Sequence, residues 1–151
     1  MDELADRPVL AIDFGGTQIR AALITPDLAV HARRAVATRD EEGVEAVVAR
    51  ICEVAAEVRA DAQAAGLPAP VGIGISAPGP LDPWRGVVVS PPNLAAWHDV
   101  PLAASVSRAL DLPAFLGTLP IVNERIGDPA FAGGTHRPQV AASATQGALR
   151  P

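Results

Sequence analysis

The feature that most constrains the fold is a pair of apolar runs, residues 9–12 and 19–24, separated by a short glycine-containing link. The link reads D-F-G-G-T-Q, with a carboxylate first, then two glycines and a threonine. Valine, leucine and isoleucine favour strands, and a glycine-containing link of this length favours a turn between antiparallel neighbours. The sequence therefore predicts a strand, a tight turn and a returning strand near the N-terminus.

The predicted turn carries groups that suit a phosphate. Gly15 and Gly16 lack a Cβ and permit positive φ, so a phosphate can approach the backbone N–H groups, and Thr17 adds a hydroxyl donor. Asp13 can hold a hydrated Mg²⁺, because magnesium prefers oxygen ligands and retains waters. The alternative is a plain hairpin in which Asp13 caps the turn. No G-x-x-x-x-G-K-[ST] occurs, and no G-x-G-x-x-G opens a helix, which excludes a P-loop and a Rossmann loop.

Composition indicates one domain that binds no nucleic acid and enters no membrane. The 151 residues are enough for one core, and the net charge of −5 argues against a nucleic-acid surface, which needs a basic face. The start, M-D-E-L-A-D-R, is acidic where a signal peptide is basic, so we expect a cytoplasmic protein. The single cysteine, Cys52, excludes an internal disulfide and a Cys-rich zinc site, and we expect it to fill core space.

A third strand is predicted over residues 28–38, which completes an antiparallel meander with Arg33 and Arg34 on a solvated face. A helix follows, with Thr38 and Glu41 resembling a capping box and Asp40 as a rival N-cap. Apolar residues recur there at spacings of three and four, which gives one buried stripe. The stripe consists of Val44, Val47, Val48, Ile51, Ala55, Val58 and Ala62.

A buried parallel strand is predicted over residues 71–76, because an apolar run after a helix is typical of one, with Gly72 and Gly74 as packing glycines. The next residues, A-P-G-P-L-D-P-W-R-G, are dense in turn formers and lead to a short strand over 87–90. Loops after the carboxyl end of a buried strand usually hold ligand contacts in α/β folds. This loop is therefore a candidate binding loop.

The segment that follows supplies a second candidate contact. Asn93 can donate and accept at once, which suits a sugar hydroxyl, and the alternative is a turn residue that bonds local backbone. We expect Trp97 to pack this segment against the core rather than to line a pocket. Asp99 is expected to cap a helix over residues 101–110, and residues 112–116 are expected to form a strand.

This β-β-β-α-β-α-β order, with a phosphate turn between the first two strands, resembles one lobe of the ribonuclease-H-like, actin/hexokinase ATPase fold. That fold is α/β, with a mixed sheet in which a three-stranded meander precedes β-α-β units. More specifically, the chain resembles the N-terminal lobe of the ROK family, which contains sugar kinases such as glucokinases and sugar-responsive repressors. Three motifs carry the resemblance: A-I-D-F-G-G-T-Q-I-R (11–20), G-I-G-I-S-A-P-G-P-L-D (72–82) and P-N-L-A-A-W-H-D-V-P-L (92–102).

The resemblance implies a site for ATP, Mg²⁺ and a hexose. Family chemistry is phosphoryl transfer from Mg-ATP to a hexose hydroxyl, with an aspartate as base to the attacking oxygen. The implied phosphate-binding residues are Asp13, Gly15, Gly16 and Thr17, with Asp13 also at the metal, and the implied sugar-binding residues are Ala77, Pro78, Gly79 and Asn93.

The chain departs from the family pattern after residue 116. Family kinases have an E-N-D-A-N-type segment there, whose aspartate is the base, whereas this chain has G-T-L-P-I. Asp111 lies before the last predicted strand and Asp128 far beyond it, so neither takes that role. We expect residues 1–116 to form the N-terminal lobe and residues 117–151 a divergent, irregular tail, as after a frame slip or truncation. A one-sided cleft leaves phosphates in water, so little or no kinase activity is expected.

Two alternatives to an incomplete sugar kinase remain open. One is the sugar-binding part of a ROK repressor, and the other is a non-catalytic interaction module. Family repressors carry a DNA reader ahead of this lobe and often vary the D-x-G-G-T turn, whereas here residues 1–8 precede the first strand and the turn is intact. These features favour kinase descent. A half-fold with an uncovered apolar face is also expected to self-associate.

Overall fold

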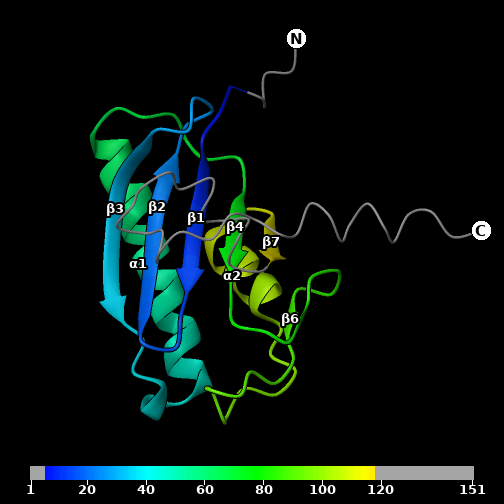
Figure 1. Ribbon diagram of the computed structural model, residues 1–151. Coiled ribbons are helices and arrows are strands. Elements are labelled where there is room, and N and C mark those ends of the chain that lie inside the picture. The colour runs from blue at the N-terminus through cyan, green and yellow to red at the C-terminus, as the bar shows by residue number, and fades with distance from the viewer. Residues whose placement is uncertain (1–5, 118–151) are drawn as a thin grey trace, which may run out of the picture.

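The computed structural model describes residues 6–117, which are built around one mixed sheet of five strands (Figure 1). β1 (Val9–Phe14) and β2 (Gln18–Ile24) form the predicted hairpin, and β3 (Val30–Ala37) pairs antiparallel with β2 to complete the meander. The strands lie in the order β3-β2-β1-β4-β7, and the last two, β4 and β7, are parallel to β1. Apart from Gly117, the predicted irregular tail lies outside the described residues.

The two parallel strands place the carboxyl ends of three strands at one edge of the sheet. β4 (Ile73–Ser76) pairs with β1, and β7 (Ala114–Gly117) pairs with β4, both in parallel. The parallel strand expected after the first helix is therefore confirmed. Because parallel neighbours end on the same side, the turn after β1 and the loop after β4 start from adjacent positions.

Both described helices lie on one face of the sheet, behind it in Figure 1. A short 3₁₀ turn, η1 (Asp40–Glu42), precedes α1 (Val44–Ala64), which packs on β1, β2 and β3, while α2 (Leu102–Leu110) packs on β7 and α1. The amphipathic stripe is confirmed, although its members Val44 and Val48 are only partly buried and Val54 was missed. The buried residues of α1 are Val47, Ile51, Val54, Ala55, Val58 and Ala62.

A small hairpin stands beside the sheet and was only half predicted. β5 (Leu81–Asp82) and β6 (Val87–Val88) pair antiparallel, whereas the sequence indicated a strand over 87–90 alone. The tip is held by Asp82, whose Oδ1 accepts hydrogen bonds from the backbone N–H groups of Trp84 and Arg85 at 3.0 and 3.1 Å. A two-residue strand among prolines gives no periodic signal, which explains the omission of β5.

The predicted helix caps are wrong. α1 has Gly43 at its N-cap, with φ 95° and no side-chain cap bond, so neither the Thr38–Glu41 capping box nor Asp40 serves this helix. The η1 turn inserted between Thr38 and α1 moves the helix start beyond the reach of both. α2 has Pro101 at its N-cap without a side-chain cap bond, so Asp99 is not the cap.

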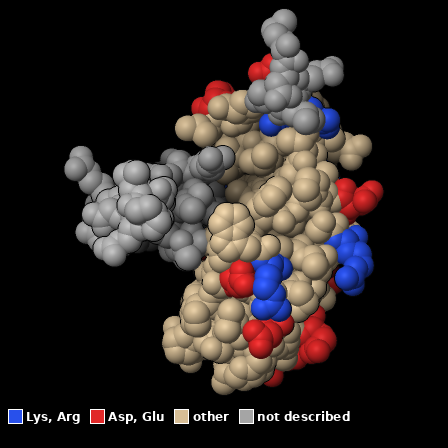
Figure 2. All heavy atoms as spheres, turned by 90° about the vertical axis from the view of Figure 1, so that its right-hand side faces the viewer, with Lys and Arg blue, Asp and Glu red and all other residues tan. Residues whose placement is uncertain are grey.

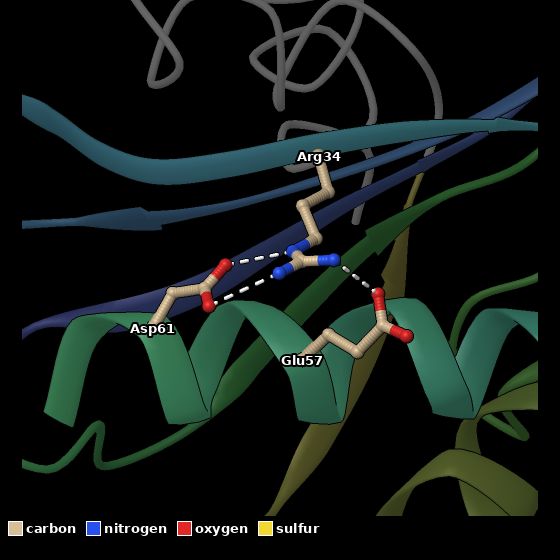
Figure 3. Close-up of polar contacts among 3 residues, drawn as sticks. All are labelled: Arg34, Glu57 and Asp61. Atoms are coloured by element: carbon tan, nitrogen blue, oxygen red, sulfur yellow. Dashed lines mark hydrogen bonds and ion pairs between the residues drawn. The ribbon is translucent and has the colours of Figure 1, made fainter. Parts of the chain in front are cut away.

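Arg33 and Arg34 are exposed as predicted, but Arg34 also binds the helix beneath the sheet (Figure 3). Its Nε donates to Oδ2 of Asp61 at 2.7 Å, and its Nη1 donates to Oε2 of Glu57 at 2.8 Å. Nη2 donates to the second carboxylate oxygen of Asp61 at 3.1 Å, so this pair is bidentate. The contact fastens the edge strand β3 to α1, which the sequence pattern did not indicate.

Candidate functional site

The carboxyl ends of the strands carry a row of four residues that crosses the sheet. Asp13 pairs in register with Arg20 of β2 on one side and with Ser76 of β4 on the other, and Ser76 pairs with Gly117 of β7. Residues directly opposite each other in register project to the same face of a sheet. A guanidinium, a carboxylate, a hydroxyl and a glycine therefore stand side by side on the face opposite the helices.

Asp13 is buried in this row with one of its oxygens unsatisfied. Its residue exposure is 8%, and Oδ2 lies 3.9 Å from Nη1 of Arg20. Among the described residues, no hydrogen-bond donor reaches Oδ1. Burial raises the pKa of the carboxyl above its ordinary value, and the charge of Arg20 opposes that rise. Asp13 therefore lies beside polar groups rather than in packed hydrocarbon, and its Oδ1 has no hydrogen-bond partner among the described residues.

The β1–β2 turn is held rigid by its own backbone and by Thr38. The N–H of Gly15 donates to the carbonyl of Gln18 at 2.8 Å. Thr38 is buried, and its hydroxyl donates to the carbonyl of Gly15 at 2.7 Å. The backbone N–H of Thr38 donates to the carbonyl of Thr17 at 2.9 Å. A Cβ on Gly15 would lie 3.1 Å from the Gln18 oxygen, so a larger residue there would displace the turn. The turn is thus preorganised.

Two corrections to the predicted phosphate turn follow. Neither Gly15 nor Gly16 adopts positive φ, so their value lies in the missing side chain. The Gly15 N–H is also engaged within the turn and is not offered outward. Gly16 and Thr17 are exposed, a Cβ on Gly16 would meet nothing within 4 Å, and among the described residues nothing accepts from their N–H groups. Phosphate binding at these two residues remains a prediction.

The loop after β4 begins next to Asp13. Ala77 is 2% exposed, and its N–H donates to the carbonyl of Gly117 at 3.3 Å, whereas Pro78 is half-buried and Gly79 is exposed. The fold thus places Ala77, Pro78 and Gly79 directly beyond the Asp13–Ser76 pair. Their role in sugar binding remains a prediction.

The Asn93 segment is anchored through its tryptophan. Trp97 is fully buried, and its ring lies against Phe14, the last residue of β1, so the expectation that it packs the segment on the core is confirmed. Asn93 is exposed in the turn just before it. Among the described residues, no hydrogen bond involves the Asn93 side chain, so the alternative of a locally bonded turn residue is not seen. The sugar contact itself remains a prediction.

A hollow among the described residues lies away from this row. It has a volume of about 300 Å³ and lies between α2, β7 and the β5–β6 hairpin, with Trp84 and Phe115 on its wall. None of the predicted site residues lines it. Within residues 6–117 no three histidine, cysteine, aspartate or glutamate side chains gather to hold a metal.

Sequence reasoning missed three residues of the site, namely Arg20, Thr38 and Ser76. Arg20 and Ser76 are the register partners of Asp13 in the neighbouring strands. Once the strand pairing is known, the alternation of side chains along each strand places them on the same face as Asp13. Thr38 was assigned to a helix cap instead.

No helix of the described residues is long and apolar enough to cross a membrane.

Comparison with known proteins agrees with this geometry. Residues 9–118 match the ROK family. The chain belongs to the ROK family. It is 32% identical over 108 residues to a glucokinase of Thermotoga maritima. The aligned residues cover 72% of this chain and 32% of that protein. The chain therefore spans about a third of the length of this ROK relative.

Solved ROK structures share the fold. The hexokinase of Thermus thermophilus is 30% identical, with a TM-score of 0.63, over 75% of this chain and 35% of that chain. The glucokinase of Streptomyces griseus, solved with glucose and AMPPNP, is 26% identical, with a TM-score of 0.64, over 75% of this chain and 33% of that one. The predicted α/β class, a lobe of the ribonuclease-H-like, actin/hexokinase ATPase fold, is thereby confirmed.

Proposed function

We propose that this chain is the phosphate- and sugar-binding N-terminal part of an ATP-dependent hexose kinase, with little or no turnover by itself. The observation that supports this most directly is the rigid D-F-G-G-T turn. Among the described residues, Oδ1 of Asp13 and the N–H groups of Gly16 and Thr17 have no hydrogen-bond partner. Similarity to a glucokinase and to a structure that holds glucose and AMPPNP supports the same substrates.

The residues of the turn divide the work of holding the nucleotide. The N–H groups of Gly16 and Thr17 and the Thr17 hydroxyl donate to phosphate oxygens, which are strong acceptors. The Asp13 carboxylate has the oxygen chemistry that Mg²⁺ prefers, and its site fits a hydrated ion because one carboxylate plus substrate phosphates commonly suffices. When bound, Mg²⁺ neutralises phosphate charge.

The sugar lies, in this proposal, beside the turn. The loop at Ala77, Pro78 and Gly79 shapes the pocket, and the Asn93 amide donates to and accepts from one hexose hydroxyl. Trp97 positions this segment through Phe14 without touching the sugar. Anchoring on a rigid core lowers the ordering cost of binding.

Low turnover follows from the sequence directly after β7. Phosphoryl transfer needs a base near the attacking hydroxyl, and in ROK kinases an aspartate just beyond the strand equivalent to β7 serves. Here that strand runs into G-T-L-P-I, which contains no carboxylate. Binding without efficient transfer is therefore the expected behaviour.

A coupled assay with ATP and glucose, paired with thermal shift, tests the proposal. We expect Mg-AMPPNP to raise the melting temperature of the full chain and Asp13→Ala to abolish the rise, with Glu53→Ala, an exposed carboxylate of α1, as the matched control. Turnover that disappears in Asp13→Ala would contradict incompleteness. No shift with Mg-AMPPNP would contradict nucleotide binding.

Sugar binding is tested separately with a panel of hexoses. Asn93→Ala and Asn93→Asp should both weaken stabilisation by the preferred hexose, because the first removes the amide and the second removes its donor. Equal stabilisation of wild type and both variants would mean that Asn93 is not a contact. A gel-shift assay in which the chain binds duplex DNA would favour the repressor alternative instead.

A cytoplasmic location remains a prediction.

A further inference from the structure

The Ser76 hydroxyl is a second buried polar group without a partner, and it stands directly beside the first. Ser76 is 0% exposed, and among the described residues nothing donates to its Oγ or accepts from it. Asp13 Oδ1 is likewise buried and has no hydrogen-bond partner among the described residues. Asp13 and Ser76 are register partners in β1 and β4. A buried hydroxyl without a hydrogen-bond partner destabilises the folded state. Two such groups at adjacent positions indicate that something else satisfies both.

The face around the pair is kept free of bulk. Gly117 follows Ser76 in the row, and Gly74, two residues earlier in β4, shares its face. A Cβ on Gly74 would meet nothing within 4 Å, so the prediction that it is a packing glycine is wrong. Ala11, the register partner of Gly74, is also small. Neither Gly74 nor Ala11 therefore places a bulky side chain on the face that carries the pair.

The charges of the row decide what kind of group fits. A free phosphate would face the Asp13 carboxylate at close range, which is repulsive. A divalent cation is attracted by Asp13, and its waters can donate to a serine oxygen, since hard cations such as Mg²⁺ keep several waters. Nη1 of Arg20 lies 3.9 Å from Oδ2 of Asp13, and Arg20 and Ser76 stand on opposite sides of Asp13 in the row.

We infer that Ser76 is a positioning residue for a hydrated divalent cation, whose waters it accepts from while Asp13 Oδ1 supplies the carboxylate oxygen. The inference rests on the proposed function in taking the nucleotide phosphates as the remaining partners of that cation. It adds to that function a residue that fixes where the cation sits between Asp13 and the β4 loop.

The experiment uses the full chain and two readouts besides turnover. Binding of Mn²⁺ alone is followed by electron paramagnetic resonance, and binding of AMPPNP is measured by calorimetry in excess Mg²⁺ and in excess EDTA. Ser76→Ala and Ser76→Gly remove the hydroxyl, and Ser105→Ala, which removes an α2 hydroxyl bonded to the carbonyl of Pro101, is the control.

We expect Mn²⁺ affinity to fall at least fivefold in both Ser76 variants and to stay unchanged in Ser105→Ala. The gain in AMPPNP affinity on adding Mg²⁺ should shrink by a similar factor, while affinity in EDTA stays the same. Ser76→Ala without ligand should be at least as stable as wild type, because it loses an unsatisfied hydroxyl rather than a hydrogen bond. A merely structural serine would give the opposite stability change and no change in Mn²⁺ affinity.

Three results would overturn the inference. One is unchanged Mn²⁺ affinity in Ser76→Ala and Ser76→Gly, and a second is a wild-type chain that binds no Mn²⁺. The third is an equal loss of AMPPNP affinity with Mg²⁺ and with EDTA, since the hydroxyl would then contact the nucleotide itself. Ser76-dependent Mn²⁺ binding without any AMPPNP binding would sustain the cation site and refute the proposed function.

Discussion

The rings of Phe14 and Trp97 lie with their centroids 4.7 Å apart and their planes inclined by 38°. Phe14 is the residue after Asp13 in β1, and Trp97 belongs to the segment that carries Asn93. Both side chains are fully buried. The contact therefore joins the candidate sugar segment to the strand end that carries the candidate phosphate turn.

Trp97→Ala should lower the free energy of unfolding by about 3–5 kcal/mol, because it opens a large cavity against Phe14. Trp97→Phe should cost less, since it keeps an aromatic ring against Phe14 and the indole N–H that it removes has no partner among the described residues. Urea unfolding measures both, with Trp84→Ala, a 96% exposed tryptophan, as the control. Equal effects of Trp97→Ala and Trp84→Ala would contradict the packing role.

Thr38→Val should loosen the phosphate turn. The change keeps the shape of the buried side chain and removes the hydroxyl that donates to the Gly15 carbonyl, at a cost of about 1–2 kcal/mol. Affinity for Mg-AMPPNP should fall as well, because the turn loses its support. Urea unfolding and calorimetry measure the two effects, and Thr38→Ser, which retains the hydroxyl, should resemble wild type. A loss of stability with unchanged affinity would argue against phosphate binding at this turn.

Acid sensitivity should depend on Arg34. Its guanidinium donates to the Asp61 carboxylate and holds the pKa of Asp61 below its ordinary value of 3.8. The stability that this pair adds is therefore fully present above about pH 3.8 and is lost as the pH falls through the lower, folded-state pKa. Arg34→Gln should return the Asp61 pKa toward 3.8 and flatten the acid limb of the stability curve.

Carbon-detected NMR titration of the aspartate carboxyls measures that pKa, and urea midpoints across the acid range measure the stability. Arg34→Lys keeps the charge but loses the bidentate geometry, so its Asp61 pKa should lie between those of wild type and Arg34→Gln. An Asp61 pKa that is the same in all three proteins would contradict the pairing drawn in Figure 3.

The side of the molecule that carries β7 and the β5–β6 hairpin should mediate self-association. Figure 2 shows on this side an area of mostly uncharged side chains, with charged ones beside it, and Arg85 of the hairpin also lines the hollow. Trp84 is 96% and Phe115 71% exposed, and both line the hollow beside α2. Exposed aromatic groups of this size favour association because burying them removes apolar area from water.

Sedimentation velocity over a range of protein concentrations tests this expectation. The wild-type chain should sediment faster as the concentration rises, and the double variant Trp84→Ser/Phe115→Ser should not. Leu28→Ser, at a 57% exposed position in the β2–β3 connection, is the matched control. A wild-type chain that stays monomeric throughout would contradict the role of this surface.

Much of the fold was predictable because its elements carry local signals. The hairpin, the meander, the α1 stripe and the buried β4 strand each show a period or a turn signature within a short window. The helix caps failed for a physical reason: cap residues are recognised by type, and Thr38 has the right type. Its hydroxyl bonds the Gly15 carbonyl, 23 residues away in the sequence, and no local pattern reveals such a competitor.

By itself the sequence determined the family and the succession of the main-sheet strands and helices along the chain, and it predicted which residues form the phosphate turn, because these depend on contiguous motifs. Tertiary structure alone decided that Arg20, Asp13 and Ser76 stand in one row, that Arg34 reaches across to α1, and that Trp97 rests on Phe14. Register and packing join residues that are distant in the chain, and which pairs meet depends on how strands align and helices dock rather than on local composition.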